Sequence, residues 1–160
     1  MEFSLIIRKA IKTDAPDIRA ILEDSFTQYI KKSGIPLSIG DMLDDIPAIE
    51  RDIENIDVYI AFLDGAPVGT VRVAIRDGEP AMLTKLGVVS DYNNIGIGKS
   101  LMNLVDKTVA GRGASSLILY TASKNTGIMR FYYGRGFYVD STSKERGYIR
   151  ALMRKDYAPG

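Results

Sequence analysis

Residues 86–101 read LGVVSDYNNIGIGKSL, and this stretch decides the fold of the chain. An apolar strand pattern runs into two glycines, Gly96 and Gly98, and then directly into an amphipathic helix pattern. Glycine has no Cβ, so such a backbone can approach an anion closely, while the first helical turn presents unpaired N–H groups at its positive end. Lys99 adds a positive charge and Ser100 a hydroxyl donor. The stretch therefore predicts a phosphate-binding loop between a strand and a helix.

The glycine spacing does not fit two common nucleotide-binding loops. The Walker loop needs a glycine at position 93, where this chain has Asn93, although residues 98–100 (Gly-Lys-Ser) match its end. The dinucleotide loop needs a third glycine at position 101, where the chain has Leu101. A nucleotide-phosphate enzyme that uses residues 98–100 stays open as a third hypothesis. A Gly-x-Gly pair also serves as an ordinary connection, so the loop alone does not identify a ligand.

The segments on either side of the loop predict the centre of a sheet. Alternating apolar patterns over 58–63, 67–75 and 81–89, separated by Asp-Gly turns, predict three consecutive antiparallel strands. After the loop, helical spacing predicts a helix over 97–110, with Gly111 and Gly113 as C-cap candidates, and an apolar run predicts a strand over 116–122. The order strand, loop, helix, strand predicts that 81–89 and 116–122 pair in parallel.

The remaining elements are expected at both ends of the chain. Before the sheet, the pattern predicts a first strand over 4–9 and a helix with Thr13 as N-cap. A break at 31–37 separates that helix from a weaker, acidic helical pattern over 38–56. Pro47 interrupts this pattern, which predicts two short helices or one kinked helix. After the sheet, the expected elements are a short helix over 125–134 and strands near 137–140 and 148–154.

Length and charge bound the class of protein. A chain of 160 residues predicts one domain, 1–160, large enough to bury a substantial core. A net charge of +1 argues against a general nucleic-acid binder, which needs a basic face. The N-terminal apolar run is too short for a signal peptide, and the apolar runs fall short of a membrane span. We therefore expect a cytoplasmic protein that binds neither nucleic acid nor membrane.

The sequence contains neither cysteine nor histidine. This composition excludes a thiol nucleophile, a Ser-His-Asp triad, an imidazole base and a cysteine or histidine zinc site. Any catalysis must come from carboxylates, tyrosine, lysine, hydroxyls or backbone dipoles, and we expect no metal cofactor.

A second motif lies downstream of the glycine loop. Its positions are Asn125, Ile128, Phe131, Tyr132, Gly136 and Phe137. In both blocks and in their order the chain resembles the GCN5-related N-acetyltransferases. That family combines an apolar strand and a Gln/Arg-x-x-Gly-x-Gly/Ala loop with a later Asn-x-x-Ala-x-x-Phe/Leu-Tyr-x-x-x-Gly-Phe motif.

The resemblance implies a fold and an activity. The fold is a mixed α/β fold with a mostly antiparallel central sheet of about six to seven strands, one parallel pair at the glycine-loop crossover, and flanking helices. The activity is transfer of an acetyl group from acetyl-CoA, as cosubstrate, to a primary amine of a small molecule, peptide or protein, directly within a ternary complex. A non-catalytic acyl-CoA-binding or regulatory domain of the same fold is the alternative, and a homodimer stays open.

The resemblance also implies roles for residues. Tyr132 is the expected general acid, which donates a proton to the departing thiolate. A backbone N–H in the motif strand, of Gly87 or Val88, is expected to polarise the acetyl carbonyl, and Asn125 to hydrogen-bond the pantetheine arm. The expected cofactor-binding residues are Leu86, Gly87, Val88, Asn93, Asn94, Ile95, Gly96, Ile97, Gly98, Lys99, Ser100, Asn125 and Tyr132.

The chain departs from the family pattern at several positions. Asn93 is shorter than the usual Gln or Arg, Ile128 replaces a small residue, and residues 81–85 lack the carboxylate that many relatives use as a base. The general base is therefore unassigned, and the candidates are Glu79, Tyr29, an acid of 41–54 acting through water, or solvent. The acids of 41–54 either attract a cationic amine or form a solvated helix face, and the second interpretation is favoured because charge runs usually face water.

Overall fold

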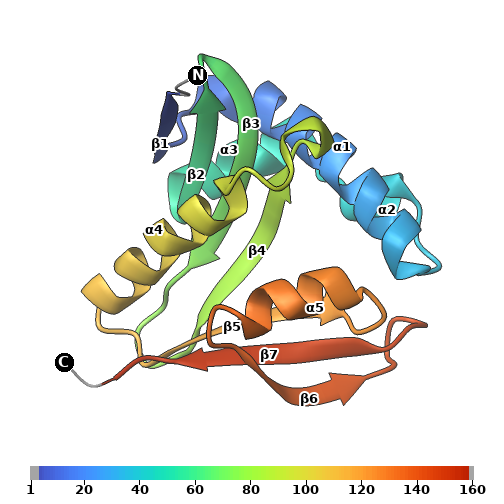
Figure 1. The fold of residues 1–160 in the computed structure, drawn as a ribbon. Coiled ribbons are helices and arrows are strands. Elements are labelled where there is room, and N and C mark those ends of the chain that lie inside the picture. Colours follow the sequence, from blue (N-terminus) through green and yellow to red (C-terminus); the bar gives the residue numbers. More distant parts are fainter. Residues whose placement is uncertain (1–3, 159–160) are drawn as a thin grey trace.

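A seven-stranded sheet forms the centre of the computed structural model, which describes residues 4–158 (Figure 1). The strand order is β1-β2-β3-β4-β5-β7-β6, and every neighbouring pair is antiparallel except β4 and β5. The predicted sheet with one parallel pair at the crossover is confirmed. The strands are β1 (Leu5–Lys9), β2 (Asp57–Leu63), β3 (Ala66–Ala74), β4 (Ala81–Val88), β5 (Ser116–Ala122), β6 (Tyr138–Ser143) and β7 (Arg150–Asp156).

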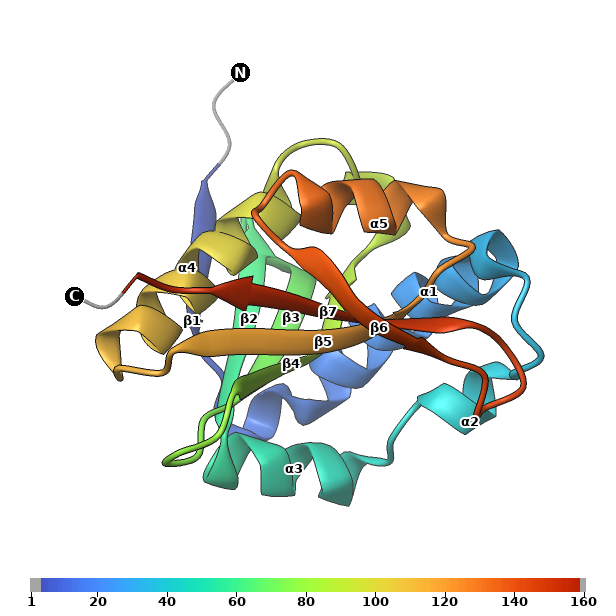
Figure 2. The same ribbon diagram turned by 90° about the horizontal axis from the view of Figure 1, so that it is seen from below.

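Helices cover both faces of the sheet. Figure 2 shows α1, α2 and α3 on one side and α4 and α5 on the other. Each side has its own apolar core, one beneath α1 and α3 and a larger one beneath α4 and α5. No helix within residues 4–158 is long and apolar enough to cross a membrane. The helices are α1 (Ala15–Ser33), α2 (Ile39–Met42), α3 (Ile46–Asn55), α4 (Ile97–Gly111) and α5 (Thr126–Tyr133), with 3₁₀ turns η1 (Lys12–Asp14) and η2 (Ser90–Tyr92).

The parallel pair β4–β5 is short, and this determines where the site lies. Only Ala81 and Met82 of β4 pair with β5, opposite Leu117 and Ile118. Beyond Met82 the two strands diverge, as the ribbon in Figure 1 shows. Within residues 4–158, the rest of β4 therefore has a strand partner on one edge only, that of β3.

An irregularity in β4 accompanies this divergence. The register with β3 shifts between Thr70 and Arg72, and Lys85 has a φ of 54°. A non-glycine residue in the left-handed region is strained and marks a place where a strand bends. The bend lies where β4 has already left β5.

Two details at the start of α1 differ from the sequence prediction. Thr13 is not the N-cap, because it lies within η1, and α1 begins at Ala15 after Asp14. The Asp14 carboxylate instead accepts the Ile11 N–H at 2.8 Å and pairs with Arg8 at 2.7 Å. Asp14 therefore closes the turn between β1 and α1.

Other boundaries also shift. Helix α1 continues to Ser33, so the break predicted at 31–37 begins later. The 38–56 pattern forms two separate helices, and Pro47 lies in the first turn of α3, where proline is tolerated. Strands β6 and β7 extend beyond the segments expected near 137–140 and 148–154.

Candidate active site

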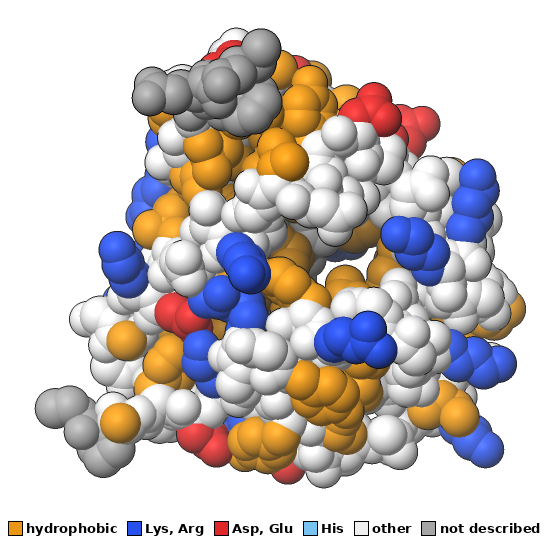
Figure 3. Space-filling model, in the orientation of Figure 1, with side chains coloured by type: hydrophobic (Ala, Val, Ile, Leu, Met, Phe, Trp, Pro, Cys, Tyr) orange, Lys and Arg blue, Asp and Glu red, His pale blue; other side chains and the backbone are white. Residues whose placement is uncertain are grey.

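The divergence of β4 and β5 opens into a cavity of about 1400 Å³. Side chains and backbone from α1, α2, β4, the loop before α4, β5, α5 and the β6–β7 loop line it. Figure 3 shows the hollow from the side of α4 and α5, with Lys and Arg side chains around it. One wall of the cavity consists of β4 and the glycine loop, the strand and the predicted phosphate-binding loop that follows it.

The open edge of β4 presents unpaired backbone groups to this cavity. The Val89 N–H donates to the Val68 carbonyl at 2.9 Å, and Val88 lies opposite Gly69. In antiparallel geometry these facts make Val88 and Gly69 a non-hydrogen-bonded pair, so the Val88 N–H and C=O are directed away from β3. Leu86 lies two residues earlier, beside the register shift, and lines the same cavity. An extended ligand can pair with such an edge as an added strand does.

Glycine at position 87 lets β4 lie close to α1. A Cβ at Gly87 would lie 3.0 Å from the Leu22 side chain and 3.1 Å from that of Ser25. A larger residue would therefore move the strand or the helix.

The glycine loop delivers bare N–H groups to the same wall. Asn94, with a φ of 70°, and Gly96, with a φ of 89°, turn the chain into α4. The Ser100 N–H donates to the Gly96 carbonyl, so the N–H groups of Ile97–Lys99 precede the first intrahelical bond. Within residues 4–158 Gly96 has no side-chain cap. The positive end of α4 is thus available to an anion.

Gly96 and Gly98 occupy backbone conformations of different kinds. Only Gly96 takes a positive φ, whereas Gly98 is an ordinary helical position where a Cβ would lie 3.5 Å from the Phe131 ring. Backbone conformation therefore requires glycine at position 96 but not at position 98, where the expected close approach of an anion stays a prediction.

Most expected cofactor-binding residues line the cavity, and two do not. Ile95 projects to the surface, and Ser100 lies in the first turn of α4 outside the cavity wall. The expected residues that line it are Leu86, Gly87, Val88, Asn93, Asn94, Gly96, Ile97, Gly98, Lys99, Asn125 and Tyr132.

Tyr132 lies at the cavity wall with its ring buried, 3% exposed. Phe131 and Phe137 contact the ring edge-on, each with a centroid distance of 5.3 Å. Burial raises the pKa of the Tyr132 phenol, and the nearby Tyr29 raises it further. The phenol therefore keeps its proton throughout the physiological pH range.

Asn125 has a structural use that the sequence analysis did not assign. Its side-chain oxygen accepts the Ile128 N–H at 3.2 Å and caps α5, and its amide nitrogen donates to the Ser33 hydroxyl at 3.3 Å. Asn125 thereby joins the start of α5 to the end of α1 beside the cavity. The N-cap preference of asparagine before a helical pattern is the signal that predicts this role.

The two named base candidates lie in different places. The Tyr29 hydroxyl, at the cavity, accepts the Ala122 N–H at 2.7 Å and lies 3.3 Å from the Thr121 hydroxyl. Glu79 is exposed in the β3–β4 turn, at the end of β4 opposite the glycine loop, and does not line the cavity. The structure therefore removes Glu79 as a base for chemistry in this cavity.

The acids of 41–54 have mainly structural uses. Arg72, 1% exposed, pairs with Asp44 at 2.6 Å and with Asp52 at 2.8 Å, which fixes α3 and the segment before it to β3. Burial disfavours the charged form of Asp44, but the hydrogen bond to Arg72 and the charges of Arg72 and Lys85 together outweigh it, so that the pKa of Asp44 is lowered. Neither interpretation of the acidic segment, as an amine attractant or as a solvated face, describes this buried pairing.

Lys85 is a cavity residue that sequence reasoning missed. It occupies the bend of β4, and its Nζ donates to the Met42 carbonyl at 2.7 Å and lies 5.4 Å from the centre of the Phe26 ring. Burial lowers the pKa of Lys85, and the nearby Asp44 opposes this. A lone lysine within an apolar strand pattern was the available signal.

A family model, described as acetyltransferase (GNAT) family, matches residues 16–137. The chain belongs to the GNAT acetyltransferase family. The matched range contains β4, the glycine loop, Asn125 and Tyr132.

Several known proteins are similar to this GNAT chain. YjcF, an uncharacterized N-acetyltransferase of Bacillus subtilis, is 29% identical over 80% of this chain and 84% of its own. A spermidine N(1)-acetyltransferase of Thermoplasma acidophilum is 30% identical over 59% of each chain. The crystal structure of the PaiA N-acetyltransferase of T. acidophilum, in complex with coenzyme A, has a TM-score of 0.86 at 24% identity and covers 96% of this chain and 99% of that one. This last likeness confirms the GNAT fold.

Proposed function

We propose that the protein is an N-acetyltransferase that transfers the acetyl group of acetyl-CoA directly to a primary amine. The observation that carries this proposal is the open edge of β4, which leads through the η2 turn into the glycine loop and the start of α4. Both segments lie on one wall of a single cavity.

The residues present fit coenzyme A. The outward N–H and C=O groups of Val88, on the open edge of β4, suit an extended arm that contains amide groups. The free N–H groups of Ile97–Lys99, with the Lys99 ammonium, suit a pyrophosphate. The coenzyme A bound by the PaiA protein, which shares the fold, supports the same ligand here.

Two groups of the chain would act directly on the thioester. Acetyl-CoA supplies an acyl group activated as a thioester. The Val88 N–H would donate to the acetyl oxygen as negative charge develops there. Tyr132 would donate its proton to the sulfur while the bond from the carbonyl carbon to the amine nitrogen forms and the bond to sulfur breaks. The absence of a cysteine to carry the acyl group supports direct transfer within a ternary complex.

Tyr29 is the residue that we propose to relay the amine proton, because its oxygen would accept that proton as its own hydroxyl proton passes to solvent. Its hydroxyl lies at the cavity and accepts the Ala122 N–H. If Tyr29 has this role, Tyr29→Phe lowers turnover, because phenylalanine cannot pass a proton on.

The test combines binding with turnover. Calorimetry measures the binding of coenzyme A, and thiol release from acetyl-CoA is followed across polyamines, aminoglycosides, amino acids and peptides with free N-termini. We expect submillimolar coenzyme A binding and thiol release with at least one amine, with the N-acetyl product identified by mass. Binding without thiol release across the panel would instead indicate an acyl-CoA-binding domain, and absence of binding would refute the proposed cofactor.

A further inference from the structure

The cavity carries an excess of positive charge. Among residues 4–158, six lysines and arginines line it, against one carboxylate, that of Asp41. That carboxylate already accepts the N–H and the hydroxyl of Ser38, at 2.8 and 3.0 Å. Lys99 lies at the start of α4 beside the proposed pyrophosphate site. The five other cations lie elsewhere on the cavity wall: Lys32, Lys85, Lys124, Arg146 and Arg150.

Arg150 stands out among these cations. Its guanidinium carbon lies 4.5 Å from the centre of the Tyr120 ring, which fixes the orientation of the group. Its Nε is buried and has no hydrogen-bond partner within residues 4–158, and no carboxylate of those residues forms an ion pair with it. A buried guanidinium nitrogen without an acceptor is unfavourable unless a ligand supplies one.

The position of Arg150 places it next to the proposed reacting groups. It is the first residue of β7 and pairs with Ala122 of β5, whose N–H donates to the Tyr29 hydroxyl. Tyr148 of the preceding loop joins the same cluster. Burial and Tyr29 raise its pKa, while Arg150 and Arg146 oppose that rise. Arg146 and Tyr148, in the loop before β7, line the same cavity as Arg150.

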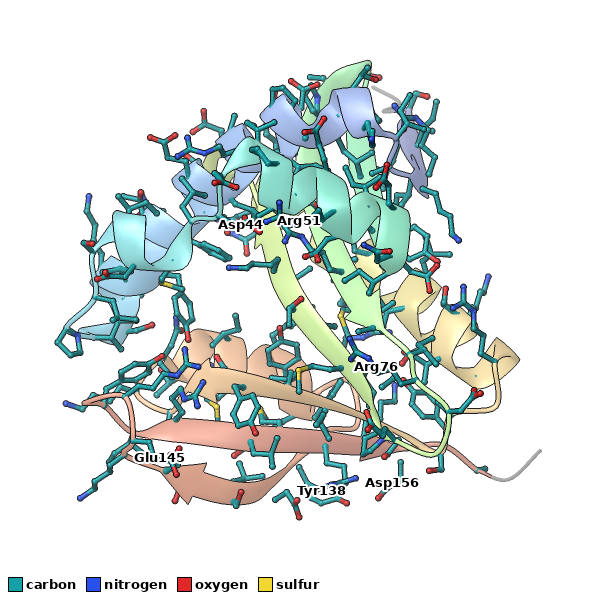
Figure 4. The ribbon with its side chains drawn as sticks, turned by 180° about the vertical axis from the view of Figure 1, so that it is seen from behind. Asp44, Arg51, Arg76, Tyr138, Glu145 and Asp156 are labelled. Carbon is teal, nitrogen blue, oxygen red and sulfur yellow. The ribbon has the colours of Figure 1, made fainter. Side chains whose placement is uncertain are left out.

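The acidic residues Asp44 and Glu145 do not face a ligand in this cavity. Figure 4 shows Asp44 beside β4, where it pairs with Arg72, and Glu145 on the β6–β7 loop. Neither lines the cavity. A polycationic acceptor would meet Arg146 and Arg150 there, and among residues 4–158 only one carboxylate, that of Asp41 on α2, lines the cavity to receive it.

We propose that the acceptor amine carries a carboxylate, as an amino acid or short peptide does, and that Arg150 binds this carboxylate. The inference rests on the proposed function, since it names the class of amine that the acetyl group would reach. The planar guanidinium matches a carboxylate with two parallel hydrogen bonds. The ligand carboxylate would also reduce the charge repulsion between Arg150 and Arg146.

The test compares matched amines on protein saturated with coenzyme A. The probes are L-leucine and L-leucinamide, the dipeptide Leu-Gly and its C-terminal amide, and spermidine. Calorimetry gives the affinity of each, and thiol release from acetyl-CoA gives its turnover. The variants are Arg150→Gln, Arg150→Lys and, as a control, Arg76→Gln, which removes an exposed arginine at the opposite end of the sheet (Figure 4).

We expect at least one carboxylate probe to bind tenfold or more tightly than its amide, and spermidine to bind more weakly than that probe. Arg150→Gln should reduce this preference for the carboxylate over its amide below threefold. Arg150→Lys should reduce it in part, because lysine keeps the charge but not the paired donors. Both variants should bind coenzyme A within twofold of wild type, and Arg76→Gln should retain the full preference.

Three results would overturn the inference: tighter binding of spermidine or of the amides, a preference that survives in Arg150→Gln, or no binding of either carboxylate probe to protein that binds coenzyme A. The inference and the proposed function fail separately. Carboxylate-selective binding without thiol release refutes only the transferase activity, whereas acetylation of spermidine with no carboxylate preference refutes only the inference.

Discussion

Replacing Tyr132 with phenylalanine separates a catalytic phenol from an aromatic core residue. The ring packs edge-on against Phe131 and Phe137, and phenylalanine keeps both contacts. The loss of one hydroxyl should therefore change the free energy of unfolding by less than about 1 kcal/mol. Because the Tyr132 side chain contributes no charge to the cavity wall, the affinity for coenzyme A should change less than about threefold.

Turnover should respond very differently. A positioned general acid contributes about 100- to 10,000-fold, so Tyr132→Phe should lower kcat by that factor, or about 3 to 5 kcal/mol in the barrier. The assay is thiol release from acetyl-CoA with the best amine, alongside thermal unfolding and coenzyme A calorimetry. Burial raises the pKa of Tyr132, so the wild-type rate should not fall from loss of this proton as pH rises to 9. An unchanged kcat in a stable variant would remove Tyr132 from the mechanism.

Three further predictions concern stability. Gly96→Ala places a side chain on a residue with positive φ and should lower the free energy of unfolding by about 1 to 2 kcal/mol. Gly98→Ala, at a helical φ, should raise it by up to about 1 kcal/mol; thermal unfolding measures both changes. Equal effects would contradict the distinction between the two glycines. Arg72→Met leaves Asp44 without its buried partner and should lower the free energy of unfolding by about 3 kcal/mol in urea titrations; a loss below 1 kcal/mol would show that the pair is dispensable. Asp106 accepts hydrogen bonds from three side chains, which together outweigh its burial and lower its pKa below 3.8. The stabilisation of the fold by the Asp106 carboxylate is therefore present above pH 3.8 and is lost as pH falls through the lowered pKa. Asp106→Asn should therefore be less stable at pH 7 and lose less stability between pH 5 and 2 than wild type, and parallel pH profiles would refute this.

The features that the sequence predicted well are those with local causes. Helix α4 and its loop follow from apolar spacing and from the conformational freedom of Gly96, both of which depend on neighbouring residues. The parallel pairing of β4 and β5 follows from the order of elements and the handedness of crossovers.

The features that sequence reasoning missed depend on residues far apart in the chain. That β4 leaves β5 after Met82 is a property of the packed sheet. The roles of Arg72, paired across 20 and 28 positions, and of Arg150, which lies over Tyr120, arise only when the strands are assembled. Glu79 failed as a candidate for the same reason, because proximity to a strand in sequence does not place a side chain at the correct end of that strand.

Amide hydrogen exchange with and without coenzyme A tests the central claim most directly. If coenzyme A pairs with the open edge of β4 and its pyrophosphate meets the start of α4, exchange should slow at Leu86 and Val88 and at the N–H groups of Ile97–Lys99. Exchange in β1 and β2, which lie away from the cavity, should not change. Unchanged exchange at the β4 edge and the α4 start, in protein shown by calorimetry to be saturated with coenzyme A, would contradict the account.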